Sequence, residues 1–270
     1  MEIRVTLILI ALVSSLIITL PNVKSVRAQE TIVINSDGSI QGTTGKILRD
    51  GDIYTLTDNF NGTITVKKNS TIIDGARYAL QGNGQHSGIG IRLSAYNSTV
   101  MNFNIRDYTV GIECSPYCYN SFMGNIIEGC YSGIHILGGY SNIIQYNTFR
   151  NNFHSISLVY CSGNNVITKN NIIVYSNDAM WVWLSQESTV DENYWSMYFG
   201  ADADDYGIGD TSHVFREVNL KSFTDNHPLM TPVDINVIPE FPSWTPLLIM
   251  LVAVMVVAVI YKRRLRPQTN

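Results

Sequence analysis

The sequence predicts an all-β fold, specifically a right-handed parallel β-helix that winds in coils of about 22 residues. Three observations predict it. Polar residues recur at a nearly constant spacing, apolar residues between them alternate with period two, and no stretch shows helical periodicity. A coil of this length cannot bury its apolar face alone, so successive coils must stack to close a core.

Two polar positions mark each coil. Asn tolerates left-handed backbone at tight bends and bonds the neighbouring main chain, so stacked Asn residues predict side-chain ladders with a rung every 4.8 Å or so. The first position is read as Asn69, Asn97, Asn120, Asn142, Asn165 and Ser188. The second lies five residues later, at Asp74 and then at the predicted structural ladder Asn102, Asn125, Asn147, Asn170 and Asn193.

A third column is apolar and alternates, which is the pattern of a strand with one face inward. We expect these pairs to stack in the core, most with a small residue just before them. The pairs are Ile91 with Leu93, Ile112 with Cys114, Ile134 with Ile136, Ile156 with Leu158, and Met180 with Val182.

The segments before and after the repeats have separate roles. Residues 1–28 read as a secretory signal with a basic start, an apolar run and small residues at the cleavage position; the alternative is an uncleaved membrane anchor. Residues 29–68 are expected to form an N-terminal cap, with strands over 31–35, 53–57 and 63–67. The repeats then cover 69–196, and 197–232 close the far end.

The C-terminus predicts an anchor. Residues 233–243 form a linker, 244–261 are long enough to cross about 30 Å of hydrocarbon as a transmembrane helix, and 262–270 form a basic tail. Positive residues stay cytoplasmic, which places the body outside. A buried core helix is the alternative. The Pro-Glu-Phe-Pro-Ser run at 239–243 resembles the C-terminal sorting signals of archaeal surface proteins. The resemblance implies that a sorting enzyme can cut off the helix and attach a lipid anchor in its place.

The charge balance limits the partners. Residues 29–261 contain 11 Lys and Arg against 21 Asp and Glu, a net of −10. Nucleic acid requires a basic face, so this class of partner is excluded.

Three closing motifs together with the coils carry a family resemblance. Asn-Tyr-Trp-Ser at 193–196, Gly-Ile-Gly-Asp-Thr at 207–211 and His-Pro-Leu-Met at 227–230 resemble the NosD-like β-helix proteins over residues 46–232. That family belongs to a wider group of carbohydrate-binding and sugar-hydrolase β-helices. Its type member assists copper-site maturation in nitrous oxide reductase, but no Cys/His/Met cluster with ligand spacing carries that chemistry here.

One outward column is the predicted ligand-binding surface. Residues between the inward pairs must also stack, and they are Arg92, Glu113, His135, Ser157 and Trp181, with Trp183 beside the last. Aromatic rings pack against sugar faces and charged groups bond hydroxyls, so the column suits a polysaccharide or envelope glycan. The alternative is an ordinary mixed solvent face.

An acidic loop is the candidate metal site. Asp202, Asp204, Asp205 and Asp210 could bring carboxylates together around Ca²⁺, a hard cation that prefers oxygen ligands. The family pattern has Gly where Asp205 stands and Asp where Tyr206 stands, so one ligand is displaced or lost. The alternative is a solvated acidic turn.

These features predict an exported, membrane-tethered binding module with no clear catalytic residues. A glycosidase needs two carboxyl groups at a set separation, and the coils contain no adjacent Asp pair. A polysaccharide lyase or glycoside hydrolase and a purely structural envelope protein are the two alternatives. Of the four cysteines, Cys114 and Cys118 form the only local disulfide option.

Overall fold

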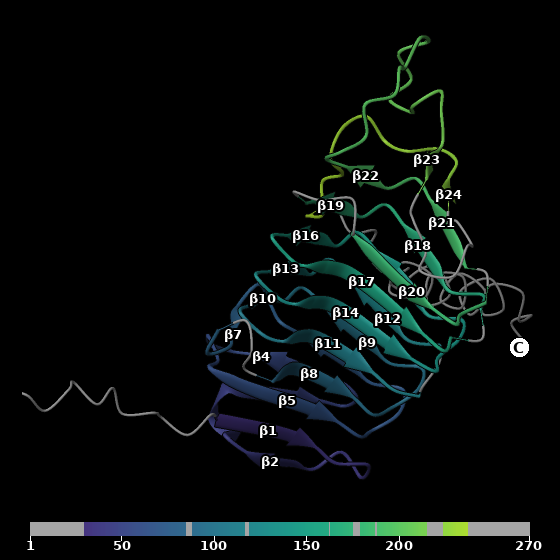
Figure 1. The fold of residues 1–270 in the computed structure, drawn as a ribbon. Coiled ribbons are helices and arrows are strands. Elements are labelled where there is room, and N and C mark those ends of the chain that lie inside the picture. Colours follow the sequence, from purple (N-terminus) through teal and green to yellow (C-terminus); the bar gives the residue numbers. More distant parts are fainter. Residues whose placement is uncertain are drawn as a thin grey trace, which may run out of the picture.

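The computed structural model describes residues 30–84, 88–116, 119–161, 163–174, 179–186, 188–214 and 224–236. These residues form an all-β right-handed solenoid of about six turns, and the fold prediction is confirmed to that extent (Figure 1). Within these ranges the helical structure is a single 3₁₀ turn, Thr44–Lys46.

Each turn contributes one strand to each of three sheets. Sheet A has the order β2-β1-β5-β8-β11-β14-β17-β20, sheet B the order β21-β18-β15-β12-β9-β6-β4-β3, and sheet C the order β22-β19-β16-β13-β10-β7. The strands of sheet A are β1 (Glu30–Ile34), β2 (Ile40–Gly42), β5 (Gly62–Val66), β8 (Ile89–Leu93), β11 (Val110–Cys114), β14 (Ser132–Leu137), β17 (His154–Val159) and β20 (Met180–Trp183).

Sheets B and C use shorter strands. Sheet B comprises β3 (Ile47–Asp50), β4 (Ile53–Leu56), β6 (Ile72–Asp74), β9 (Thr99–Met101), β12 (Ser121–Met123), β15 (Ile143–Gln145), β18 (Val166–Thr168) and β21 (Thr189–Asp191). Sheet C comprises β7 (Ala79–Gln81), β10 (Asn104–Arg106), β13 (Ile126–Glu128), β16 (Thr148–Arg150), β19 (Asn171–Ile173) and β22 (Tyr194–Trp195). A two-stranded antiparallel pair, β23 (His213–Val214) and β24 (Thr224–Asp225), lies beyond them.

The predicted inward pairs are confirmed. Ile112 pairs in parallel with Ile91 on one side and with Ile134 on the other, and Cys114 with Leu93 and Ile136. All of these side chains are fully buried. The period-two alternation of apolar residues therefore predicts correctly which side chains of sheet A point into the core.

The Asn ladders run through the buried corners of the solenoid. Asn125 donates its main-chain N–H to Asn147 Oδ1, Asn147 to Asn170 Oδ1, and Asn170 to Asn193 Oδ1, each at 3.0 Å. The side-chain amides also donate to main-chain carbonyls, as Asn147 does to Phe122 at 2.8 Å. A parallel ladder joins Ser98, Asn120, Asn142, Asn165 and Ser188.

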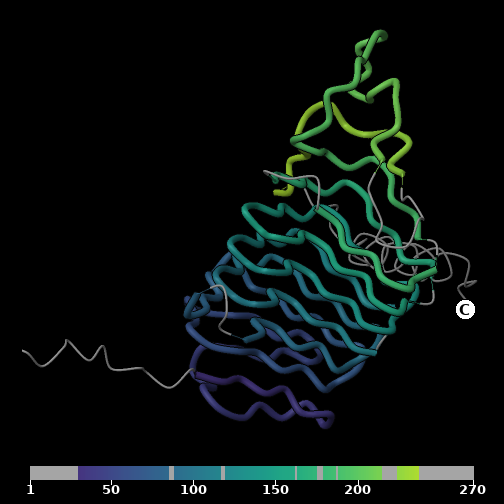
Figure 2. The backbone as a smooth tube through the Cα atoms, in the orientation of Figure 1, coloured from purple at the N-terminus to yellow at the C-terminus, as the bar shows by residue number. Residues whose placement is uncertain are grey.

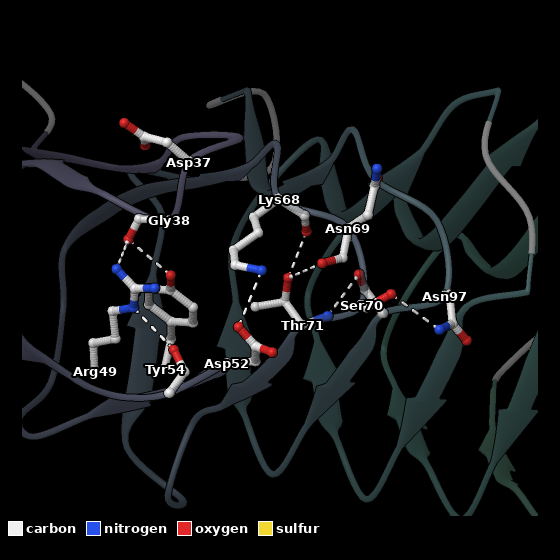
Figure 3. A network of polar contacts seen from close by, with 12 residues as sticks. Asp37, Gly38, Arg49, Asp52, Tyr54, Lys68, Asn69, Ser70, Thr71 and Asn97 are labelled. Atoms are coloured by element: carbon white, nitrogen blue, oxygen red, sulfur yellow. Dashed lines mark hydrogen bonds and ion pairs between the residues drawn. The ribbon is translucent and has the colours of Figure 1, made fainter.

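The ladder prediction is wrong by one residue at the N-terminal end. Phe103, and not Asn102, stacks below Asn125, because its main-chain N–H donates to Asn125 Oδ1 at 3.1 Å. Asn102 sits one residue earlier in left-handed backbone (φ 58°) and donates to Asp74. Asn97 is displaced from Ser98 in the same way (φ 53°) and donates to Ser70 (Figure 3). Asn is a preferred residue both at the buried rung and at the exposed bend beside it, so residue type alone cannot tell the two positions apart.

The N-terminal end is closed by two antiparallel pairs, β1 with β2 and β3 with β4. Arg49 Nη1 and the Tyr54 hydroxyl both donate to the Gly38 carbonyl at 2.8 Å, and Lys68 pairs with Asp52 at 3.0 Å (Figure 3). Strand β5 pairs in parallel with both β1 and β8, so it is already part of the solenoid and not of a separate cap.

The C-terminal end is closed by a buried carboxylate. Asp225 Oδ2 accepts from the main-chain N–H of Asn193 at 2.9 Å and from Trp195 Nε1 at 2.9 Å, so it ends the Asn ladder. The chain projects beyond the last coil and then returns along the solenoid (Figure 2). There Val233 and the Asn171 side chain exchange two hydrogen bonds, and Arg77 donates to the Ile235 carbonyl.

The predicted signal at 1–28 and the predicted transmembrane helix at 244–261 lie outside the described residues. Within the described ranges, no helix has the length and apolar character needed to cross a membrane.

The ladder predicts a large cost for losing one rung. Replacing Asn147→Ala removes the partners of the buried Asn125 N–H and Phe122 carbonyl, so we expect the free energy of unfolding to fall by about 2–4 kcal/mol. Asn97→Gly is the control, since it keeps the left-handed bend and removes an exposed bond, with an expected change below roughly 0.5 kcal/mol. Urea denaturation measures both; equal effects would contradict a dominant role for the ladder.

Close coil stacking predicts a second cost, at a glycine. A Cβ on Gly133 would lie 2.5 Å from the Ser155 carbonyl oxygen and 2.9 Å from the Phe149 ring. Gly133→Ala should therefore destabilise the fold by about 1–3 kcal/mol through overpacking. Gly45→Ala, where a Cβ meets nothing within 4 Å, is the matched control in the same denaturation experiment. An unchanged midpoint for Gly133→Ala would show that the coils are not packed this tightly.

Candidate functional site

The predicted outward column is assembled on sheet A. Glu113 lies between Arg92 and His135 in the parallel register, and Ser157 lies between His135 and Trp181. The column therefore crosses five successive strands, β8, β11, β14, β17 and β20. Trp183 pairs with Val159 two residues further along the same two strands.

The lower part of the column is polar and electrically balanced. Arg92 Nη1 lies 3.2 Å from Glu113 Oε1, with the Arg92 side chain half exposed. Burial lowers the pKa of His135 below its usual value, while the Glu113 carboxylate opposes that shift. His135 is therefore held toward its neutral form, in which one ring nitrogen donates and the other accepts a hydrogen bond.

The upper part of the column is aromatic. The Trp181 and Trp183 rings are nearly parallel, with 2° between their planes and 6.2 Å between centroids. Both indoles are half-buried, while Ser157 on the preceding strand is buried. The two residues thus present a pair of aligned flat rings on the last strand of sheet A.

These two rings belong to a larger group that the sequence prediction missed. Trp181 lies 5.3 Å from His154, His154 lies 4.5 Å from Phe153, and Phe153 stacks on Tyr131 at 5.0 Å and 13°. We call Tyr131, Phe153, His154, Trp181 and Trp183 the aromatic cluster. Tyr131 and Phe153 remain 48% and 54% exposed, so about half of each ring is open to a ligand.

A signal for the missed residues exists in the repeat. Tyr131 and Phe153 are 22 residues apart, which is the coil length, and each directly precedes a strand of sheet A. The equivalent residue one coil earlier is Thr109, because Val110 pairs with Ser132 in the register, and Thr109 is half-buried. Of the described coils, aromatic residues therefore fill this position only in the two that enter sheet A at β14 and β17.

The acidic loop does not gather its carboxylates around a common point. Asp202 Oδ2 accepts from the Gly207 N–H at 2.8 Å, Asp210 Oδ2 accepts from Ala203 at 2.9 Å, and Asp204 accepts from Tyr206. Asp205 is exposed in left-handed backbone (φ 59°). The carboxylates thus hold main-chain turns, and the calcium prediction finds no support in the described part of the chain, where no three metal-ligating side chains cluster.

Three cysteines of the described residues are buried in the core, namely Cys114, Cys130 and Cys161. Cys114 accepts a hydrogen bond from the Asn120 amide at 3.4 Å, and Cys118, its predicted disulfide partner, lies outside the described residues. Burial raises the pKa of Cys130 to about 12 and raises that of Cys161. The Cys130 and Cys161 thiols are therefore protonated, and all three cysteines are enclosed as small core side chains.

A polar cavity of about 440 Å³ lies beside the closing segment, and its lining includes Asn164, Ser188, Asp191 and Asn226. Asp191 Oδ1 lies 2.9 Å from His227 Nδ1. The hydrogen bond to Asp191 raises the pKa of the exposed His227 above its usual value. This pair links the last strand of sheet B to the closing segment.

The raised pKa of His227 predicts a pH-dependent closure. A histidine whose folded pKa exceeds its unfolded value adds stability that is present below the unfolded value and lost as pH rises through the folded one. His227→Gln should therefore lower Tm more at about pH 6 than at about pH 8.5 relative to the unaltered chain. Asp191→Asn should remove the same difference. An equal Tm deficit at both pH values would rule out a charged pair.

The comparisons with known proteins give one match. The family described as "Periplasmic copper-binding protein (NosD)" matches residues 63–209. No curated protein and no solved structure matches the chain. The matched range begins in β5 and ends beyond β22, so it spans the solenoid and part of the acidic loop.

Copper does not fit the residues that the structure describes. Copper sites use thiolate, thioether or imidazole ligands grouped around one point. In the described ranges no such His, Cys, Asp or Glu group forms, and the three buried thiols are enclosed in the core. The matched range covers more than half of the sequence and coincides with the stacked coils that carry the Asn ladders, and on that basis the chain belongs to the NosD family of β-helix proteins.

Proposed function

We propose that this chain is an exported, surface-tethered module that binds carbohydrate on the outer face of sheet A. The observation that carries the proposal is the aromatic cluster, in which five rings touch in sequence across three coils. The ligand is a polysaccharide or another glycan of the cell envelope.

The cluster has the shape that a sugar requires. A pyranose has one largely apolar face, which packs on a flat aromatic ring, and hydroxyl groups around its edge. Trp and Tyr combine a flat apolar body with a polar tip, and they recur at binding surfaces for that reason. The parallel rings of Trp181 and Trp183 and the stacked pair Tyr131 and Phe153 offer two such platforms.

Polar groups lie next to these platforms on the same sheet. His135, Glu113 and Arg92 continue the column down from Trp181 and supply donors and acceptors for sugar hydroxyls. Arg92 is neutralised by Glu113 at 3.2 Å. A neutral glycan therefore fits this face better than a polyanionic one, which would need uncompensated cations.

Binding is favoured over hydrolysis at this face. A glycosidase requires two carboxyl groups about 5–9.5 Å apart. The outward column from Arg92 to Trp181 contains one carboxylate, that of Glu113, and an arginine holds it. For this reason we propose a module without turnover.

We propose that one end of the sequence exports the chain and that the other end tethers it to the membrane. The family name describes a periplasmic protein, which agrees with export. The predicted signal at 1–28 would deliver the chain across the membrane, and residues 239–270 would hold it at the surface as a helix or, after processing, a lipid anchor.

The proposal predicts a loss of glycan binding without loss of fold. Changing Trp181→Ala and Trp183→Ala together removes one platform, and aromatic contacts of this kind contribute about 0.5–1.5 kcal/mol each. We expect roughly a five- to 150-fold weaker affinity for the bound polysaccharide, measured by affinity electrophoresis against galactomannan, xyloglucan and hydroxyethyl cellulose.

Phe199→Ala is the matched control, because Phe199 is 84% exposed in the closing segment and is separate from the cluster. It should bind as the unaltered chain does. Circular dichroism confirms that each variant stays folded. Full binding by the double tryptophan variant would exclude the sheet A site, and release of reducing sugar during the assay would favour a hydrolase or lyase instead.

A further inference from the structure

A second row of exposed aromatic side chains lies at the corner where the chain passes from sheet A to sheet B. Tyr96 is 50% exposed, Tyr119 57%, Tyr140 37% and Tyr160 57%. They follow β8, β11, β14 and β17 respectively, so successive coils contribute one each. We call these four residues the tyrosine row. Tyr119 and Tyr140 contact edge to face, with 5.4 Å between ring centroids.

Two members of the row occupy backbone that disfavours them. Tyr119 has φ 59° and Tyr160 has φ 53°. One coil earlier, the position of Tyr119 is held by Asn97 (φ 53°), and the position of Tyr160 is held by Gly138 (φ 75°). Asn and Gly are the residues that adopt left-handed backbone most easily, whereas a bulky ring pays a steric cost there.

Folding does not recover that cost. Both rings are more than half exposed, so neither adds a buried side chain to the core. Strained, exposed residues that persist in a fold concentrate at ligand contacts. Exposed patches of aromatic side chains also mark ligand-binding surfaces. The two observations are independent, since one concerns the backbone and the other the side chain.

The tyrosine row is continuous with the aromatic cluster. Tyr160 donates its main-chain N–H to the Trp183 carbonyl at 2.9 Å, and Val159 pairs with Trp183 in the register. The strand β20 therefore connects the two groups: Trp181 and Trp183 lie on it, and Leu184, 56% exposed, follows it at the corner above Tyr160.

We infer that the tyrosine row is a second contact row for the same ligand, and that the ligand is a neutral polysaccharide several sugar units long. The inference rests on the proposed function. From Tyr119 to Tyr160 the row spans two coil steps, about 10 Å along the solenoid. The phenol rings supply flat faces and hydroxyl groups without charge, as a neutral glycan requires.

The test uses the full-length chain with Tyr119→Asn and Tyr160→Asn together. Asn suits left-handed backbone, so Tm should stay equal or rise by a few degrees. Affinity for galactomannan, xyloglucan or hydroxyethyl cellulose, whichever the unaltered chain binds, should fall about tenfold. Affinity for a two-unit oligosaccharide of the same polymer should change less than twofold, because the aromatic cluster still holds it.

The outcomes separate this inference from the function that it extends. If the unaltered chain binds polymer and the tryptophan variant does not, the proposed function holds. Polymer binding by the tyrosine variant at full strength would then overturn the second row alone. If the unaltered chain binds none of the three polymers, nor polygalacturonate, both proposals fail. An equal loss for polymer and two-unit oligosaccharide would also overturn the second row, since it would place the short ligand there too.

Discussion

The stacking of buried Asn amides between coils is the constraint on which the rest of the structure depends. Each rung of the ladder from Asn125 to Asn193 fixes the main chain of one coil to the side chain of the next. These bonds lie in the core, where an unpaired amide would cost far more than it does in water. The ladder therefore sets the coil register, and Asp225 ends it where the repeat stops.

That register decides which side chains can form a site. Since equivalent positions stack, a single outward position becomes a column, and a flat ring on one strand meets the residue one coil away. Trp181 contacts His154 in this way, and His154 in turn contacts Phe153, although Trp181 and His154 are 27 residues apart in the chain. A surface built so is rigid before a ligand arrives, which limits the ordering cost of binding.

The sequence predicted the parts of the fold that repeat and missed those that do not. Inward pairs such as Ile134 and Ile136 were predictable, because apolar residues that alternate with period two all point to the same side of a strand. Asn102 was misplaced because an exposed bend and a buried rung select the same residue. Phe153 was missed because residue type alone does not distinguish an exposed aromatic side chain at a corner from one buried in the core. The role of Asp225 at the end of the ladder could not be predicted, because it lies 32 positions after Asn193 and outside the coil repeat.

Hydrogen exchange at the ladder amides tests this account most directly. The main-chain N–H groups of Asn125, Asn147 and Asn170 donate to side chains inside the core, so their exchange should require global unfolding and match the unfolding free energy. NMR-detected exchange in deuterated buffer measures each amide separately. Exchange of these three amides as fast as that of exposed bends such as Asn97 would contradict the central role of the ladder.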